Sequence, residues 1–158
     1  MQAVPFTIER AFDAPVNVLW RAITDKDEMK QWYFDLKEFK AEPGFKFSFT
    51  GGEDDRQYLH LCEVIDVIPD KKISYTWKYD GYPGLSKVIF ELFPEGAKTR
   101  LKLTHEGLET FPASNPDLAK RILLGGWKRS LAHHLGNILL KDPPERGCRT
   151  IKGAFFCY

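Results

Sequence analysis

Hydrophobic and polar residues alternate with a period of two over much of this chain, and this pattern predicts a β-sheet. Phe6, Ile8 and Phe12 share one side of the stretch 5–12, as in a half-buried strand. The same period returns between residues 34 and 106, where glycine and proline turns interrupt it about every ten residues. The predicted strands are 5–12, 35–40, 44–49, 58–68, 72–79, 86–93 and 98–105. We therefore expect a seven-stranded antiparallel sheet.

Two short helices are predicted directly after the first strand, because the apolar spacing changes there from two to between three and four. Val16, Leu19 and Ile23 would form the buried stripe of the first helix. The residues 24–27, Thr-Asp-Lys-Asp, have the pattern of a capping box that opens a second helix. Trp32 would lie on the inward side of that helix.

A long helix is predicted over residues 115–140. Asn115 is a suitable N-cap with Pro116 in the first helical position, and the prolines after Asp142 would end the helix. Its apolar residues recur at spacings that average helical: Leu118, Ile122, Leu124, Trp127, Leu131, Leu135 and Ile138. The interior pair Gly125-Gly126 costs about 1 kcal/mol per glycine relative to alanine. We expect a close approach of helix backbone to the sheet as the compensation.

The predicted order is one strand, two short helices, six strands and one long helix, which indicates an α+β fold. Seven strands need a cover on one face, and residues 115–140 are the only predicted element long enough to provide it. A twisted sheet of this size curls, and we expect it to curl around that helix. Residues 1–141 would then form one domain. The tail 142–158 ends in apolar residues, so we expect it to pack on the domain, to extend a sheet edge, or to join two copies as a homodimer.

Composition adds an aromatic interior to this picture. The chain has 12 Phe, 6 Tyr and 4 Trp in 158 residues, which suggests a large apolar core or an aromatic-lined pocket. Residues 113–158 carry eight Lys and Arg against three Asp and Glu. We interpret this excess as the solvated side of the long helix, and we expect no nucleic-acid partner because no recognition motif accompanies it.

Cysteine usage and hydropathy indicate where the protein works. Three cysteines argue against a disulfide framework and for a reducing compartment, so we expect a cytoplasmic protein. The N-terminus has no secretory signal pattern. No window approaches eighteen apolar residues, so we expect no membrane insertion.

Several segments in a fixed order resemble a known family. The segments are FTIERAFDAPVNVLWRAITDKDEMKQW, EPGFKFSFTGG, IPDKKISYTW, KTRLKLTHEGL and GGWKRSLAHHL, which together span roughly residues 5–140. They resemble the activator-of-heat-shock-protein-ATPase-homologue family (AHSA1-like) of the START-like, SRPBCC superfamily. The resemblance implies the helix-grip fold, in which a curved antiparallel sheet closes on the C-terminal helix around an apolar cavity. Members of that superfamily carry lipids, hormones or polyketides, and some are enzymes.

The leading hypothesis is therefore a binding protein for a small apolar or aromatic ligand, without a defined catalytic reaction. The helix residue Trp127 would face Phe47, Tyr75, Trp77, Phe90 and Leu103 across the interior. The residues expected to bind the ligand are Trp32, Phe47, Phe49, Tyr75, Trp77, Phe90, Leu103, His105, Trp127 and Leu131. Two alternatives stay open. One is a module that contacts a heat-shock chaperone, as the family resemblance implies. The other is an enzyme acting on a hydrophobic substrate through His105 or Tyr75.

Other candidate chemistry is weak in this sequence. His105 could act as a general base, but no third group is evident to orient it, so we favour a histidine hydrogen-bonded into the cavity wall. His133 and His134 would point about 100° apart on a helix and cannot share one metal ion. His60 has only Cys62 nearby in its strand. We expect no metal and no cofactor.

Overall fold

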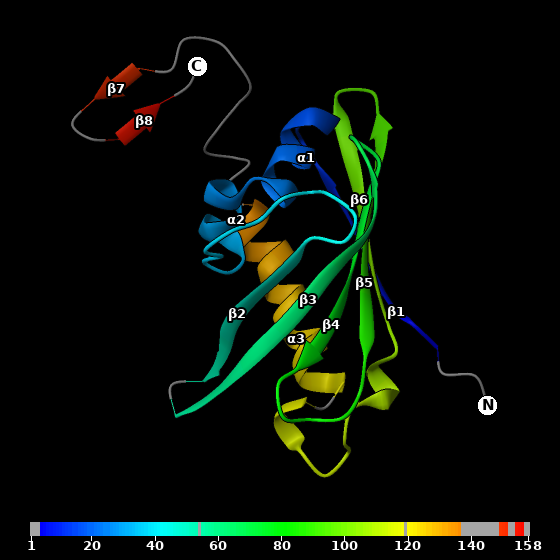
Figure 1. The fold of residues 1–158 in the computed structure, drawn as a ribbon. Coiled ribbons are helices and arrows are strands. Elements are labelled where there is room, and N and C mark those ends of the chain that lie inside the picture. Colours follow the sequence, from blue (N-terminus) through cyan, green and yellow to red (C-terminus); the bar gives the residue numbers. More distant parts are fainter. Residues whose placement is uncertain (1–3, 54, 119, 137–148, 152–153, 157–158) are drawn as a thin grey trace.

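A six-stranded antiparallel sheet forms the body of the protein (Figure 1). The computed structural model describes residues 4–53, 55–118, 120–136, 149–151 and 154–156. The strands of the sheet lie in the order β1-β6-β5-β4-β3-β2. Their bounds are Phe6–Phe12 for β1, Lys46–Glu53 for β2, Arg56–Ile68 for β3, Lys72–Tyr79 for β4, Ser86–Glu95 for β5 and Lys98–Glu106 for β6.

The alternation in the sequence sets which face of each strand is buried. In β5 and β6 buried residues alternate with half-buried ones, so Val88, Phe90 and Leu92 share the inner face with Leu101 and Leu103 across the pair. β3 departs from this regularity, since its register with β4 shifts between Val64 and Asp66. Such a bulge bends the strand and increases the local twist, which helps the sheet to curve.

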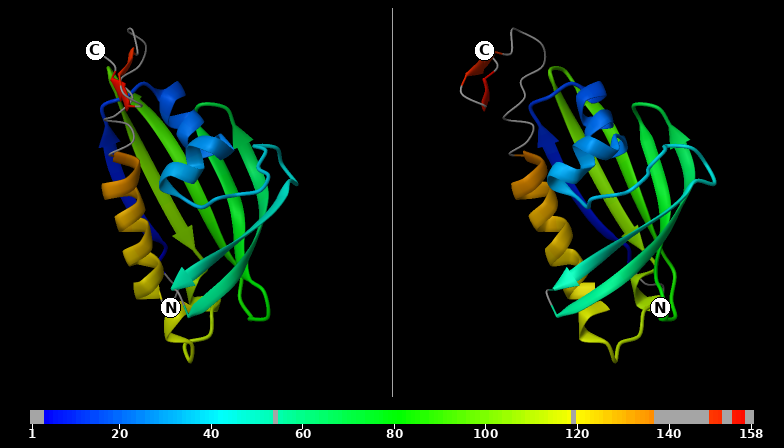
Figure 2. Two further views of the ribbon diagram at one scale, coloured as in Figure 1. Left: turned by 90° about the vertical axis from the view of Figure 1, so that its left-hand side faces the viewer. Right: turned by 60° about the vertical axis from the view of Figure 1, so that its left-hand side comes forward.

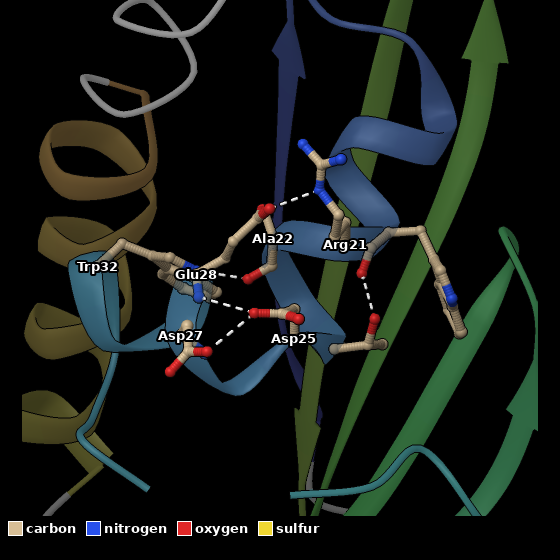
Figure 3. A network of polar contacts seen from close by, with 8 residues as sticks. Arg21, Ala22, Asp25, Asp27, Glu28 and Trp32 are labelled. Atoms are coloured by element: carbon tan, nitrogen blue, oxygen red, sulfur yellow. Dashed lines mark hydrogen bonds and ion pairs between the residues drawn. The ribbon is translucent and has the colours of Figure 1, made fainter. Parts of the chain in front are cut away.

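Two short helices, α1 (Val16–Thr24) and α2 (Lys26–Trp32), follow β1 as predicted. Asp25 caps α2, because its carboxylate accepts hydrogen bonds from the backbone N–H groups of Asp27 and Glu28 (Figure 3). The indole of Trp32 donates to the carbonyl oxygen of Ala22 at 2.7 Å, and this buried bond locks the second helix onto the first. The segment that follows Trp32 therefore leaves α2 in a defined direction.

The C-terminal helical region lies on the concave side of the sheet (Figure 2). It begins with a 3₁₀ turn, Pro116–Leu118, continues as the α-helix α3 (Lys120–Arg129) and changes to π-helical geometry over Ser130–Leu135. Trp127, Leu131 and Leu135 are buried at a spacing of four residues, so one stripe of this region faces the sheet.

Three expectations from the sequence need correction. Residues 35–40 form no strand, and the sheet has six strands instead of seven. Residues 115–140 are not shown to be one uniform helix, since the part up to 136 combines 3₁₀, α and π turns and 137–140 fall outside the described residues. A Cβ atom built on Gly125 or Gly126 would meet nothing within 4 Å, so these glycines do not provide a close backbone approach to the sheet.

The tail contains a second, small sheet in which β7 (Arg149–Ile151) pairs with β8 (Ala154–Phe156). Residues 142–148, 152–153 and 157–158 fall outside the described part. The domain boundary at 141 and the packing of the tail on the domain or on a second copy therefore stay predictions. Within the described residues, no helix has the length and apolar character to cross a membrane.

The β2–β3 hairpin depends on one glycine. Gly52 has a φ of +149°, and a Cβ at this position would lie 2.1 Å from the carbonyl oxygen of Arg56. We predict that Gly52→Ala lowers the free energy of unfolding by about 3 kcal/mol, because both the backbone conformation and the contact are unfavourable. The measurement is chemical denaturation.

The matched control is Gly96→Ala in the β5–β6 turn. Gly96 also has a positive φ, +67°, but a Cβ there would meet nothing within 4 Å, so only the conformational cost of about 1–2 kcal/mol should appear. Equal losses in the two variants would contradict the steric part of this explanation.

Candidate functional site

A cavity of about 220 Å³ lies between α3 and the strands β2, β3 and β4. Among the described residues that line it, most are aromatic and one, Arg56, is charged. The residues that line it are Tyr33, Phe34, Gly51, Gly52, Arg56, Tyr58, His60, Trp77, Tyr79, Leu118, Gly126, Trp127 and Ser130. This composition suits a small molecule with an apolar or aromatic body and a few polar groups.

The side chains of the cavity come from β3, β4, the C-terminal helical region and the segment after α2. Trp77 and Tyr79 lie on either side of the exposed Lys78 in β4, and Tyr58 and His60 lie on either side of the exposed Leu59 in β3, so each pair shares one face of its strand. Tyr33 follows α2 directly, so the bond of Trp32 to α1 also fixes its position. Its ring stacks on that of Trp127 with centroids 5.6 Å apart and an interplanar angle of 17°.

Two glycines shape the cavity in opposite ways. Gly51 in β2 lies under the ring of Phe34, where a Cβ would approach Phe34 Cε1 to 2.8 Å. Here the absence of a side chain allows Phe34 to close over the strand. Gly126 on α3 faces open space, so the absence of a side chain there keeps part of the cavity empty.

A chain of buried hydrogen bonds forms the wall behind Trp127. The Trp127 indole N–H donates to Nδ1 of His105 at 3.0 Å, and His105 Nε2 lies 2.8 Å from Ser86 Oγ. Because Nδ1 accepts a bond, the proton of the neutral ring is on Nε2 and donates to Ser86. Ser86 Oγ in turn donates to the carbonyl oxygen of Trp77 at 3.1 Å. Every polar group of this chain therefore has a partner.

This arrangement gives His105 a structural role. The residue is fully buried, and burial lowers its pKa from 6.5 to about 3. Both ring nitrogens are used in bonds to Ser86 and Trp127, so neither is available to take a proton from a substrate. His105 anchors the helix to the sheet instead.

The other titratable groups near the cavity are also kept neutral by burial. Burial lowers the pKa of His60 to about 4, and bonds to the backbone of Tyr58 and Phe49 offset part of this shift. Burial raises the pKa of Tyr79 to about 12 and raises the pKa values of Tyr33 and Tyr75 well above 10.

Tyr33 and Tyr75 bond to each other through their hydroxyl groups, which lie 3.0 Å apart. In the described part of the chain, no set of three or more His, Cys, Asp or Glu side chains could hold a metal ion. Cys62 is a buried free thiol whose pKa burial raises. Burial thus favours the neutral forms of this thiol and of both tyrosine hydroxyl groups.

The structure separates the residues expected at the cavity into two groups. Trp77 and Trp127 line it. The others are buried in the adjoining hydrophobic core or in the hydrogen-bonded wall and do not line the cavity: Trp32, Phe47, Phe49, Tyr75, Phe90, Leu103, His105 and Leu131. Contact of any of these residues with a ligand stays a prediction.

Several lining residues were not anticipated from the sequence, among them Tyr33, Phe34, Arg56 and Tyr58. Tyr33 and Phe34 lie in an irregular segment that the alternation pattern does not describe. Arg56 and Tyr58 lie near the hairpin turn, and their approach to α3 follows from the curvature of β2 and β3. A sequence signal that could have indicated the cavity is the glycine pair inside a helix. Each glycine destabilises the helix, so its presence there suggests a requirement for open space.

Comparison with protein families identifies a match over most of the chain. The model of the family described as "Activator of Hsp90 ATPase homolog 1-like protein" matches residues 13–139. No curated protein matches the chain significantly.

Solved structures with the same fold include three that illustrate its range. CV1439 from Chromobacterium violaceum is 21% identical, with a TM-score of 0.72 over 87% of this chain and 98% of that one. MLL2253 from Mesorhizobium loti is 27% identical, with a TM-score of 0.68 over 87% and 96%. DynU16, a protein in the dynemicin biosynthetic locus, is 20% identical, with a TM-score of 0.70 over 88% of this chain and 48% of that one. At these identities the structural likeness establishes the fold.

The two buried histidines should make stability depend on pH. Their pKa values are lowered to about 4 (His60) and about 3 (His105), so below pH 6.5 the unfolded chain binds protons that the folded chain does not. We predict that the free energy of unfolding is highest above pH 6.5. It should fall as the pH drops below 6.5, by about 1 kcal/mol per pH unit for each histidine between pH 6 and 5. Chemical denaturation at a series of pH values measures this slope.

The control for this prediction is His60→Phe, which keeps an aromatic ring against Phe49 but removes one titrating group. The variant should lose about half of the pH slope. A wild-type stability that stays constant from pH 6.5 to 4.5 would show that these histidines are not kept neutral by the fold.

Proposed function

We propose a ligand-binding function for this chain, which belongs to the family of Activator of Hsp90 ATPase homolog 1-like proteins. The ligand would be a small apolar or aromatic molecule bound between α3 and the strands β2–β4. The observation that carries the proposal is the cavity of about 220 Å³ with aromatic walls and an open floor at Gly126. Burial of a ring between these walls would remove its apolar surface from water. Each Å² of apolar surface buried would contribute about 25 cal/mol of favourable free energy to binding.

Gly126 supports this function because a glycine inside a helix destabilises that helix. A glycine inside a helix is about 1 kcal/mol less favourable than alanine. At Gly126 an alanine would meet no steric obstacle, since nothing lies within 4 Å of its Cβ. Gly126 therefore lowers the stability of the helix and leaves empty space beside the aromatic rings of the cavity. A ligand site needs such a space.

The neighbouring geometry does not support the enzyme alternative. His105 uses both ring nitrogens in structural bonds, and the Tyr75 hydroxyl bonds to Tyr33 with a pKa that burial raises. Burial also favours the neutral forms of the lining residues Tyr33, His60 and Tyr79, by raising the pKa of each tyrosine and lowering that of the histidine. Binding without catalysis is the function that this site supports best.

A chaperone-interacting module is the second candidate, favoured by the family match and by the exposed basic residues Lys128 and Arg129 on α3. Its test is capture of a purified heat-shock chaperone ATPase by the immobilised protein. Capture that survives moderate salt and disappears in a Lys128→Glu, Arg129→Glu variant would support it. Absence of capture at low salt would exclude it.

The ligand proposal is tested by closing the cavity from the helix side. Gly126→Phe places a ring in the space that Gly126 leaves open, so we expect binding of a neutral naphthalene fluorophore such as prodan to weaken at least tenfold. Fluorescence titration measures the affinity. Native mass spectrometry of gently purified protein, before and after solvent extraction, measures whether a natural ligand co-purifies.

Gly125→Phe is the matched control, because Gly125 is exposed on the same helix and does not line the cavity. It should leave prodan affinity within about twofold of the wild type, since neighbouring helix positions point about 100° apart. Equal loss in both variants, or no binding to the wild type, would refute the proposal.

A further inference from the structure

The hydroxyl groups of Tyr33 and Tyr75 together hold one more hydrogen-bond donor than their own bond uses. Their oxygen atoms lie 3.0 Å apart, so one hydroxyl donates to the other. Each hydroxyl carries one hydrogen, and this bond uses only one of the two. In the described part of the chain, neither hydroxyl has a further hydrogen-bond partner. One O–H hydrogen of the pair therefore has no acceptor among the described residues.

The surroundings of the pair indicate which tyrosine carries this hydrogen. Tyr75 is 1% exposed, and its ring packs in the core against Phe47 and Phe90. Tyr33 lines the cavity and is only half-buried. An unused donor is costly in an apolar core but can be satisfied beside a cavity, so the favourable arrangement has Tyr75 donating to Tyr33. The O–H hydrogen of Tyr33 is then left for a molecule in the cavity.

Contacts on several sides hold the Tyr33 side chain in place. Its ring stacks on Trp127 and meets Phe34 edge-on, with centroids 4.7 Å apart, and its backbone N–H donates to the carbonyl oxygen of Met29 at 2.7 Å. Accepting a bond from Tyr75 also polarises the Tyr33 hydroxyl and strengthens it as a donor. A fixed donor of this kind selects a ligand by the position of its acceptor atom.

Burial makes the cavity more suitable for a neutral ligand than for a charged one. It raises the pKa values of Tyr33 and Tyr75, so both hydroxyls keep their hydrogens at neutral pH, and it lowers the pKa of His60. The same loss of contact with water would penalise a charged ligand beside these groups. Among the described lining residues Arg56 is the one that carries a charge, and it has an ion pair with Asp55. A neutral acceptor such as a carbonyl oxygen therefore suits the Tyr33 hydroxyl best.

The cavity also limits the size of the ligand. Its volume of about 220 Å³ is below the range of about 300–1,000 Å³ that is usual for drug-sized ligands. Most of the described residues that line it are aromatic. It therefore suits a molecule of one or two flat rings.

We propose that the natural ligand is a neutral aromatic carbonyl compound of one or two rings, such as an aryl ketone, an aryl aldehyde or a quinone, whose carbonyl oxygen accepts a hydrogen bond from the Tyr33 hydroxyl. This inference rests on the proposed function. It adds the polarity of the ligand and the residue that selects for it.

The experiment compares three ligands that share one ring system: 2-acetonaphthone, 2-ethylnaphthalene and 2-naphthoate. At neutral pH they are a neutral acceptor, a hydrocarbon of nearly the same shape and an anion. Competition against prodan, followed by fluorescence with the full chain, gives the three affinities. The ketone should bind about fivefold more tightly than the hydrocarbon, as one neutral hydrogen bond allows, and more tightly than the anion.

Variants assign this preference to Tyr33. Tyr33→Phe should lower the ketone affinity to that of the hydrocarbon, while the hydrocarbon affinity stays within about twofold of the wild type and thereby shows that the site is intact. Tyr75→Phe should keep a preference for the ketone, because the Tyr33 hydroxyl remains. Tyr82→Phe is the matched control, since Tyr82 is 40% exposed and does not line the cavity. It should leave all three affinities within about twofold of the wild type.

Infrared spectroscopy of bound 2-acetonaphthone observes the hydrogen bond directly. The carbonyl stretching band should lie at lower wavenumber in the wild type than in Tyr33→Phe, because accepting a hydrogen bond weakens the C=O bond. A loss of packing alone would not produce this difference. The same band position in both proteins would contradict the assignment to Tyr33.

The two levels of the proposal fail in different ways. Equal affinities of the wild type for the ketone and the hydrocarbon, or tighter binding of 2-naphthoate than of the ketone, would overturn the carbonyl inference and leave the ligand site intact. A ketone preference that survives Tyr33→Phe, or that disappears in Tyr75→Phe, would overturn the assignment to Tyr33. Absence of binding for prodan and all three naphthalenes would overturn the proposed function and this inference with it.

Discussion

One buried hydrogen bond, from the indole of Trp127 to His105, connects the C-terminal helix to the sheet. The histidine can accept it because its other nitrogen donates to Ser86, which in turn donates to the backbone of β4. In a low-dielectric interior such a chain is strong when every member has a partner and costly when one is missing. It fixes the ring of Trp127 beside Tyr33 and Trp77, and thereby sets the distance between helix and sheet. The same ring lines the cavity, so this chain of bonds fixes one of its walls.

Much of the architecture follows from the sequence because burial on one face imposes a period of two on every strand. β1, β3, β4, β5 and β6 appear close to their predicted bounds for this reason, and the capped helix α2 appears where Asp25 and its neighbours predict it. The same reasoning wrongly predicted a strand over residues 35–40. In that segment only Leu36 is fully buried, and no strand pairs with the segment. Alternation describes which side chains are buried, but hydrogen-bonded pairing needs a neighbouring strand, which a single sequence does not specify.

The site was less predictable than the fold. Inner-face residues such as Phe47, Phe90 and Leu103 were expected at the cavity, yet they fill the core beside it. Whether an inward side chain meets another side chain or empty space depends on the curvature of the sheet and on the path of irregular segments. Tyr33, Phe34 and Arg56 reach the cavity by such paths. Gly126 is an example. Its destabilising effect on the helix is evident from the sequence, but the structure is needed to show that it faces open space and not a close contact.

The central claim is that an aromatic molecule can occupy the space between Trp77, Trp127 and Gly126 without displacing the wall. Crystals of the protein grown with prodan, whose naphthalene has two rings, would test it most directly. The account predicts electron density for the two rings between α3 and β4, with the Trp127–His105 hydrogen bond retained. Density showing the space filled by side chains of the protein, with the ligand elsewhere or absent, would contradict it.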